Sequence, residues 1–309
     1  METALAAETN VGAERLHLPV MRAEVRALLC ERAARLIVDA TVGTGGHAEM
    51  LLQGSGGAVL LGLDRDPGAL AAASERLSRF GSRSILRHGD FAGIEQALAD
   101  AGLGAPDAIL ADLGMSSFAL DDPARGFSFR SDGPLDMRMD PAASLRAYDL
   151  VNEESEDELA RIIREFGEEH AARRIARVIV QARRSAPIAS TAELRALVER
   201  AAGGRRPRAG IHPATRTFQA LRIAVNREIE SLDAFLECAP RCLNAGGRLA
   251  IIAYHSLEDR PVKHRFRTLA AEGEFTLLTR KALRPSVAEC AHNPRARSAR
   301  LRAIERETR

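Results

Sequence analysis

Short apolar runs recur along the chain and are separated by stretches with helical spacing. The runs lie at 36–40, 58–64, 84–88, 106–112 and 247–254, with weaker ones at 274–279 and 299–305. This alternation predicts a parallel sheet wound with helices. Ligands of such sheets bind at the carboxyl ends of the strands, where Asp39, Asp64 and Asp112 end their runs.

The strand pattern stops between about 145 and 240, where the apolar positions follow helical spacing. Ser155, followed by Glu158, predicts a capping box that opens a helix. Thr191 is expected to cap a later helix, and Pro213 suits the first turn of a long helix that continues through Leu232. A helical block that interrupts an α/β pattern predicts an inserted domain.

Residues 110–140 fit neither pattern. A long polar segment punctuated by glycine and proline follows Asp112. Loops of this length inside a compact domain are usually functional or disordered. Apolar side chains that a solvated linker would not carry argue against disorder, namely Phe127, Phe129, Leu135, Met137 and Met139. We therefore expect this segment to form the rim of an active site.

The composition is that of a globular protein with a substantial core, since 46% of the residues are apolar and 28% are charged. Only 4% are aromatic, so aromatic platforms for carbohydrate or single-stranded nucleic acid are poorly supplied. No apolar run approaches a membrane span, and the N-terminus lacks the features of a signal peptide. Cys30, Cys238, Cys242 and Cys290 complete no zinc ligand set. We expect a cytoplasmic protein that binds no metal.

The net charge of +2 hides a strong segregation of charge. Residues 149–169 are rich in Asp and Glu, whereas residues 171–222 carry twelve arginines against two glutamates. Clustered arginine suits contacts with phosphate. The only lysines are Lys263 and Lys281, so the use of arginine in place of lysine is what a coding bias would produce. The clustering, rather than the arginine identity, indicates a nucleic-acid partner.

A glycine-rich turn, DATVGTGGH at 39–47, follows the first run and precedes a helical stretch. Gly43, Gly45 and Gly46 allow a ligand to approach the backbone closely. Their spacing departs from the G-x-G-x-x-G fingerprint of dinucleotide sites, which disfavours a dehydrogenase. The turn alone is equally compatible with a tight connection between a strand and a helix.

Two further strand ends carry groups suited to a nucleoside. The Asp64 carboxylate can accept both hydroxyls of a ribose, while the alternative role of a helix cap fits Asp66, before Pro67, better. Asp90 and Phe91 follow the third run, where they can bond the amine and pack on the ring of an adenine. With the glycine turn, these positions favour S-adenosylmethionine over a dinucleotide.

Two later segments supply candidate residues on the acceptor side. Asp112 opens DLGMSS, which is not the Asp- or Asn-Pro-Pro sequence of many amino-methyltransferases. In AYHSLEDR, His255 and Glu258 are candidates for substrate contact or proton transfer, although a structural role for His255 is equally expected. Ser256 is expected to cap the next helix, with Asp259 closing the box.

Taken together, these segments resemble one family closely, the small-subunit ribosomal RNA cytosine-N4 methyltransferases known as the RsmH or MraW family. The similarity begins at HLPVMRAEV and runs through DATVGTGGH, GLDRDP, HGDF, DLGMSS, GFSF, PLDMRMD, IHPATRTFQALRIAVNREI and GGRLAIIAYHSLEDRPVK to NPRARSARLRA. The resemblance covers nearly the whole chain. It implies an α/β, class I (Rossmann-like) S-adenosylmethionine-dependent methyltransferase with a mostly parallel seven-stranded sheet. The implied core comprises 1–117 and 213–309, and an inserted all-helical domain comprises 118–212.

The resemblance also implies roles for individual residues. It places Gly45, Gly46 and His47 at the methionine end of the cofactor and Asp112 near the reacting centre. The full set expected to bind S-adenosylmethionine is Gly43, Gly45, Gly46, His47, Asp64, Asp90, Phe91 and Asp112. The residues expected to act in catalysis are Asp112, Ser116, Ser117 and His255. In one departure, the family usually reads DLGVSSPQLD with a glutamine that contacts the cofactor, whereas this chain has Phe118 and Ala119.

The implied substrate is a cytidine in the decoding region of 16S rRNA within the small ribosomal subunit, and a homodimer remains open. The insertion is expected to hold RNA through phosphate contacts, with Arg222 as a further candidate beyond it. The RNA-binding residues expected are Arg173, Arg174, Arg177, Arg205, Arg206 and Arg216. Two other functions stay open: a methyltransferase acting on DNA or protein amines, and a non-catalytic assembly factor that retains the fold.

Overall fold

The computed structural model describes residues 19–115, 117–203 and 212–308. Within these residues, seven strands form one sheet in the order β3-β2-β1-β4-β5-β7-β6. The strands are β1 (Leu36–Asp39), β2 (Val59–Asp64), β3 (Ser84–His88), β4 (Ala108–Asp112), β5 (Arg248–Ala253), β6 (Phe275–Leu277) and β7 (Arg300–Arg306). Strands β1 to β5 run parallel, and β7 is antiparallel to β5 and β6. The predicted mostly parallel seven-stranded sheet is confirmed.

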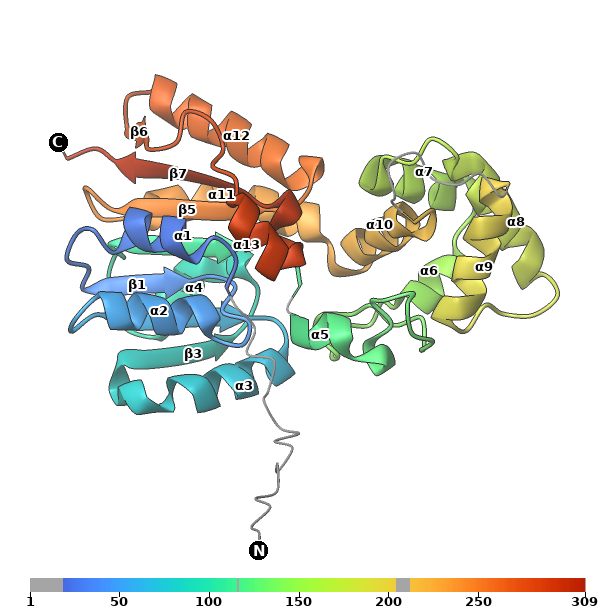
Figure 1. The fold of residues 1–309 in the computed structure, drawn as a ribbon, viewed down its shortest axis with the longest axis horizontal. Coiled ribbons are helices and arrows are strands. Elements are labelled where there is room, and N and C mark those ends of the chain that lie inside the picture. The colour runs from blue at the N-terminus through green and yellow to red at the C-terminus, as the bar shows by residue number, and fades with distance from the viewer. Residues whose placement is uncertain (1–18, 116, 204–211, 309) are drawn as a thin grey trace, which may run out of the picture.

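Helices cover both faces of the sheet (Figure 1). One face packs against α1 (Arg22–Leu29), α2 (Gly46–Gly54) and α3 (Pro67–Leu77), and the other against α4 (Ile94–Asp100), α11 (Glu228–Cys242) and α12 (Ser256–Ala271). Neighbouring residues of β1 serve different faces, since Ile37 joins the first core and Val38 the second. Burial on both faces explains why these strands read as continuous apolar runs.

A further hydrophobic core lies beside the sheet. It is formed by a loop and by α6 (Ala147–Glu153), α7 (Glu156–Gly167), α8 (Ala172–Arg183), α9 (Thr191–Ala202) and α10 (Ala214–Asn226). We call residues 119–226 the helical body and the remaining described residues the sheet body. Figure 1 shows the two bodies side by side, connected near α5 (Ser117–Asp121) and between α10 and α11.

Two helix starts in the helical body test the predicted caps. Ser155 caps α7 as predicted, because its hydroxyl accepts a hydrogen bond from the Glu158 N–H. The Glu158 carboxylate, expected to complete the box, instead accepts from Arg161. The prediction that Thr191 caps α9 was wrong. Ser190 is the cap, and Glu193 completes the capping box. Thr191 is instead buried, and its hydroxyl accepts from the Gly133 N–H at 3.0 Å, which ties α9 to the loop.

The single long helix predicted after Pro213 was also wrong, because it breaks at Arg227. Arg227 has φ 51° and ψ 42°, in the left-handed region, and separates α10 from α11. Asn226 fixes this break: its side-chain amide donates to the Met137 carbonyl at 2.8 Å and accepts from the Met139 N–H at 2.7 Å. As a result α10 packs in the helical body and α11 packs on the sheet.

The predicted division into 1–117 with 213–309, and 118–212, stays a prediction. Helix α10 follows the expected boundary, yet most of its buried residues belong to the core of the helical body. Packing therefore favours a return to the sheet body near Asn226. No helix in the described parts of the chain combines the length and the apolar character needed to cross a membrane.

Candidate active site

Two adjoining cavities open at the carboxyl ends of the parallel strands. The smaller measures about 60 Å³ and is lined mainly by the sheet body, together with Ala119 and Met139 of the helical body. The larger measures about 400 Å³ and is lined by residues of both bodies. Thr41, Asp64 and Leu113 are among the residues that line both. Strand ends next to a second body are where α/β proteins bind their ligands.

The glycine turn between β1 and α2 forms one wall of the larger cavity. Gly43 and Gly45 have φ of 51° and 82°, which side chains rarely adopt. Gly43, Gly46 and His47 line the cavity, whereas Gly45 is not among its lining residues. The Gly43 N–H donates to the Asp64 carboxylate at 2.8 Å, so the turn is held against the end of β2.

Asp64 ends β2 and lines both cavities. Its two oxygens accept from the N–H groups of Gly43, at 2.8 Å, and Asp66, at 2.9 Å. Burial raises the pKa of Asp64, and the two hydrogen bonds oppose that rise. Each oxygen keeps a lone pair for a further donor. Asp66 caps α3 as predicted, accepting from the Gly68 N–H, and also pairs with Arg125 of the helical body at 2.9 Å.

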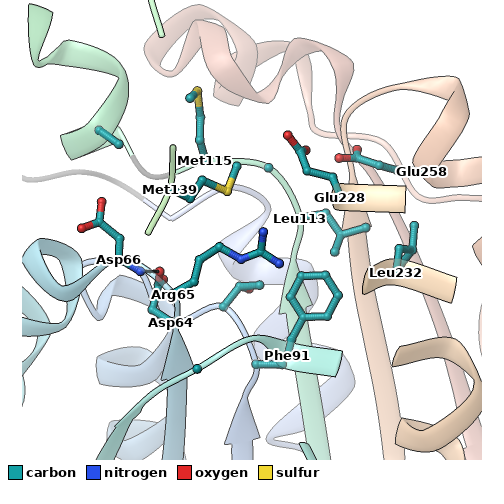
Figure 2. Close-up of a pocket in the computed structure, with 15 residues that line it drawn as sticks. Asp64, Arg65, Asp66, Phe91, Leu113, Met115, Met139, Glu228, Leu232 and Glu258 are labelled. Atoms are coloured by element: carbon teal, nitrogen blue, oxygen red, sulfur yellow. Dashed lines mark hydrogen bonds between the residues drawn. The ribbon is translucent and has the colours of Figure 1, made fainter. Parts of the chain in front are cut away.

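Apolar side chains dominate the smaller cavity, where Phe91 faces Leu113 and Leu232 (Figure 2). The Arg65 side chain crosses this space. Its guanidinium carbon lies 5.8 Å from the centre of the Phe91 ring, and it donates to the Asn226 carbonyl at 2.7 Å. The cavity therefore combines a flat apolar wall with a cation that is anchored to the junction of the two bodies.

Asp90, expected to bond an adenine amine, is not among the residues that line either cavity. Its oxygens accept from the Ala92 N–H at 2.9 Å, from the Ser231 hydroxyl at 2.8 Å and from the Arg65 guanidinium. The expected adenine contact stays a prediction, and Oδ1, which accepts only the Ala92 N–H among these bonds, keeps a lone pair for it.

Asp112 ends β4 and lines the larger cavity. The phenol of Tyr254, just after the neighbouring strand β5, donates to Asp112 Oδ1 at 2.7 Å. Burial and the Asp112 carboxylate raise the pKa of Tyr254 well above its ordinary value, so the phenol remains a donor. The Asp112 N–H donates to the Thr41 hydroxyl at 2.7 Å, and Asp112 Oδ2 lies 3.6 Å from His47 Nε2. One oxygen is thus fixed and the other faces the histidine.

A second acidic side chain, that of Asp39, lies close to Asp112 and His47. Asp39 and His47 are 1% and 6% exposed, and Asp39 Oδ2 and both His47 ring nitrogens have no hydrogen-bond partner in the described structure. Burial raises the pKa of Asp39 to about 7, although His47 acts in the opposite direction. Asp39 was read from the sequence only as a strand end.

We expect the folding stability to fall between pH 4 and pH 7 because of Asp39. The pKa of Asp39 is about 7 in the folded protein and has its ordinary value of 3.8 in the unfolded chain. The stability that Asp39 contributes is therefore fully present below pH 3.8 and is lost as the pH rises through about 7. Asp39→Asn should remove this dependence and stabilise the protein by a few kcal/mol at pH 8, at about 1.4 kcal/mol per pKa unit. Urea unfolding of both proteins at pH 5 and pH 8 tests this, and parallel pH dependences would contradict it.

Glu258 is buried and holds the start of α12. One of its oxygens accepts from the N–H groups of Tyr254, at 2.7 Å, and His255, at 3.3 Å. Burial would raise the pKa of Glu258, but His255 and the Arg222 guanidinium hold that pKa below its ordinary value. Glu228, His255 and Glu258 offer three ligand atoms within 4.8 Å of one another. Both Glu228 oxygens already accept from Arg222, at 2.8 and 2.9 Å, so Arg222 is committed to this pair rather than to an outside phosphate.

The predicted cap of α12 was wrong. His255, not Ser256, is the N-cap. The Ser256 hydroxyl donates to Glu168 of the helical body at 2.6 Å. Asp259, expected to close the box, instead pairs with Arg302 at 2.6 Å. Both side chains serve contacts between distant segments, which a local pattern does not reveal.

The arginines expected to bind RNA are spread over the helical body. Arg173, Arg174 and Arg177 are exposed on α8, which Figure 1 places on the side of the helical body away from the sheet. Arg216, on α10, is 45% exposed and donates to the Glu168 carbonyl at 3.3 Å. Ser116, Arg205 and Arg206 lie outside the described residues.

The family of the chain is established by comparison with known protein families. The model of the MraW methylase family matches residues 14–307. The chain belongs to the MraW methylase family.

Relatives of this MraW methylase match along almost their full length. A protein of Syntrophotalea carbinolica named ribosomal RNA small subunit methyltransferase H is 49% identical over 306 residues, covering 94% of this chain and 98% of the relative. A protein of the same name from Cyanothece sp. is 50% identical over 293 residues and covers 95% of each chain. One from Sorangium cellulosum is 49% identical over 290 residues, covering 94% of this chain and 90% of the relative.

In this MraW methylase, the expected rim segment lines both cavities. Ala119 and Met139 line the smaller, and Phe127 and Phe129 line the larger. Ala119, where the family usually has glutamine, is 3% exposed, so the departure falls on the cavity wall. Ser117 is the first residue of α5.

Three side chains of this MraW methylase site were missed in the sequence. Tyr254 holds Asp112, Arg65 crosses the smaller cavity, and Thr41 binds the backbone of β4. Tyr254 is the last residue of the run predicted as a strand at 247–254, and this position was the available signal. Neither Arg65 nor Thr41 belongs to a pattern that would single it out.

Proposed function

We propose that this methylase transfers a methyl group from S-adenosylmethionine to the exocyclic N4 of a cytidine in the decoding region of 16S rRNA, in the cytoplasm. Family membership and the names of the relatives support small-subunit ribosomal RNA as the acceptor. The observation that carries the proposal is the Asp112 carboxylate, fixed through one oxygen by Tyr254 at a cavity between the two bodies. A carboxylate held in this way suits an acceptor that must lose a proton, as an amine does.

The residues present fit S-adenosylmethionine. The flat apolar wall at Phe91 suits an adenine ring, and Asp64, which lines both cavities, suits the ribose between the two ends of the cofactor. His47 lines the larger cavity with two unpartnered ring nitrogens, as a group that binds the methionine end should. When bound, S-adenosylmethionine supplies an electrophilic methyl group and a neutral thioether as the leaving group.

The chain's main catalytic task is to position the acceptor amine. The cytidine N4 is a poor nucleophile because its lone pair is delocalised into the ring, and alignment of the amine with the methyl carbon supplies much of the acceleration. A base held in a stack must first leave it to reach the cavity. Phe129 and Phe218, which pack edge to face with ring centres 5.1 Å apart, line the side of the cavity formed by the helical body.

Asp112 accepts a hydrogen bond from the amine and receives the proton that N4 loses as its new bond to carbon forms. Tyr254 occupies Oδ1, which leaves Oδ2 for this role. His255 lines the same cavity and is assigned to the pyrimidine edge. Ser116 and Ser117 follow Asp112 closely in the chain and are assigned to the same surroundings.

The exposed arginines of the helical body, including Arg173, Arg174 and Arg177, are assigned to phosphates of the RNA substrate. Because phosphate contacts release counterions, the affinity for RNA should fall steeply with salt. A flat salt response would remove this assignment.

The first test is methyl transfer from labelled S-adenosylmethionine to three acceptors that lack the modification: free 16S rRNA, small subunits and whole ribosomes. The product nucleoside is identified by mass. We expect N4-methylcytidine in at least one acceptor. Label in a different nucleoside would overturn the N4 assignment. Label only in ribosomal protein, or only in DNA offered as a fourth acceptor, would replace the acceptor class. Cofactor binding without transfer to any acceptor would favour an assembly factor.

A further inference from the structure

An exposed basic segment lies outside the helical body, and no role has been assigned to it above. Residues 280–297, here called the C-terminal basic segment, connect β6 to β7 and contain α13 (Val287–His292). Their only carboxylate is Glu289. Their cations are Arg280, Lys281, Arg284, Arg295 and Arg297, and all five are exposed.

Most of these cations have no anionic partner within residues 19–115, 117–203 and 212–308. Among the ion pairs of the described residues, none involves Arg280, Lys281, Arg284 or Arg297, whereas Arg295 pairs with Asp121 at 2.9 Å. The carboxylate of Glu289 accepts from the Met21 N–H at 2.6 Å and forms no ion pair with a described cation, so one negative charge stands against five positive charges in the segment. The segment therefore presents uncompensated positive charge to solvent.

The backbone of the segment is nevertheless held in place. Leu283 and Leu301 exchange backbone hydrogen bonds of 2.9 and 3.1 Å, which fix the segment to β7. The bond from Met21 to Glu289 fixes α13 to the start of the sheet body, and Ala296 is fully buried. Charges on an ordered backbone bind a partner with less loss of conformational entropy than charges on a free tail.

The segment also lies beside the candidate site. Arg295 lines the larger cavity together with Asp112 and His255. Figure 1 shows α13 at the carboxyl ends of the strands, on the side of the sheet body that faces the helical body. The arginines of α8 lie on the opposite side of the helical body, so the C-terminal basic segment is the nearer cluster of cations.

We propose that the C-terminal basic segment binds the phosphates of the RNA strand that flanks the target nucleotide, an inference that rests on the proposed function. A base that leaves its stack must be held by its backbone on both sides, and phosphate contacts are what fix such a register. Arginine suits this role, since its planar fork matches phosphate oxygens. The segment holds the strand from the sheet body, while the helical body touches it from the other side of the cavity.

The test is the variant Arg280→Gln/Arg284→Gln/Arg297→Gln in the full chain, with the matched control Arg26→Gln/Arg35→Gln/Arg241→Gln. The control arginines are equally exposed, but they lie before β1 or β5, at the amino ends of the strands. The affinity for unmodified 16S rRNA is measured by filter binding at several salt concentrations. Cofactor binding and kcat at saturating RNA are measured on the same samples.

We expect the triple variant to bind RNA about tenfold more weakly. Its salt slope should be shallower by about 0.7 for each phosphate that is no longer neutralised, or roughly 2 in all. Its kcat and cofactor binding should match those of the control.

A triple variant that equals the control in affinity and slope overturns the proposal, even if the wild type methylates 16S rRNA normally. Weaker binding with an unchanged slope also overturns it, because the three arginines then do not neutralise phosphates. A wild type that neither binds nor methylates 16S rRNA overturns both this inference and the proposed function.

Discussion

Asp112→Asn is expected to lower kcat for methyl transfer by roughly 10²–10⁴-fold, the range that proton transfer to a positioned side chain contributes. Asparagine keeps the shape of the side chain, and its carbonyl oxygen can still accept from Tyr254. It cannot receive a proton from the acceptor amine. Single-turnover methylation with saturating cofactor measures the effect without a contribution from product release.

Cofactor affinity, measured by calorimetry on the same variant, separates two roles of Asp112. Normal turnover would remove Asp112 from the mechanism. Lost cofactor binding, with a rate at saturation equal to the wild type, would reduce Asp112 to a cofactor ligand. Tyr254→Phe is the companion variant: it leaves the carboxylate charge and removes only the 2.7 Å hydrogen bond that orients it, so an intermediate loss of kcat is expected.

Gly133→Ala should disrupt the rim loop while leaving the sheet intact. A Cβ at this position would lie 2.0 Å from the Pro123 carbonyl oxygen, which is far inside contact distance. The Gly133 N–H also bonds the Thr191 hydroxyl at 3.0 Å, so the loop cannot retreat without releasing α9. We expect a loss of about 3 kcal/mol, the upper part of the usual range for overpacking, and loss of methyl transfer. Hydrogen exchange of residues 119–139 against residues 36–64 locates the damage.

Gly104→Ala is the matched control, because a Cβ there meets nothing within 4 Å. It should unfold at the same urea concentration as the wild type, or at a slightly higher one, since alanine restricts the unfolded chain. If Gly133→Ala behaves like Gly104→Ala, the close approach of Gly133 to Pro123 does not constrain the loop. The same comparison at Gly126 is less clean, because Gly126 also has φ 68° and would be strained by any side chain.

The sheet could be read from the sequence because its central strands β1, β2, β4 and β5 are buried on both faces and flanked by polar residues. All seven runs became strands. The break at Arg227 could not be read, since apolar positions at helical spacing continue past it through Ile229 and Leu232. A single left-handed residue changes the direction of a helix without changing its periodicity. Only the bonds from Asn226 to a loop almost ninety residues earlier, at Met137 and Met139, show why the break is stable.

The candidate site was predictable as far as it depends on strand ends. Asp64 and Asp112 follow from the rule that ligands lie at the carboxyl ends of parallel strands. The partner of Asp112 did not follow, because Tyr254 is 142 residues away and meets it only through the pairing of β4 with β5. The expectation for Asp90 rested on its position alone, and its engagement by Ser231 depends on the packing of α11, which no local pattern encodes.

The junction at Asn226 and Arg227 is a fixed connection between the two bodies rather than a flexible one. Asn226 binds the rim loop through its side chain and Arg65 through its carbonyl, so three segments meet at one residue. If a ligand in the smaller cavity displaced Arg65, the bond from Arg65 to the Asn226 carbonyl would be lost. Asn226 also holds the rim loop and ends α10, so both segments would be affected. A ligand in the smaller cavity would therefore compete for the Arg65 side chain, which ties this cavity to the junction of the two bodies.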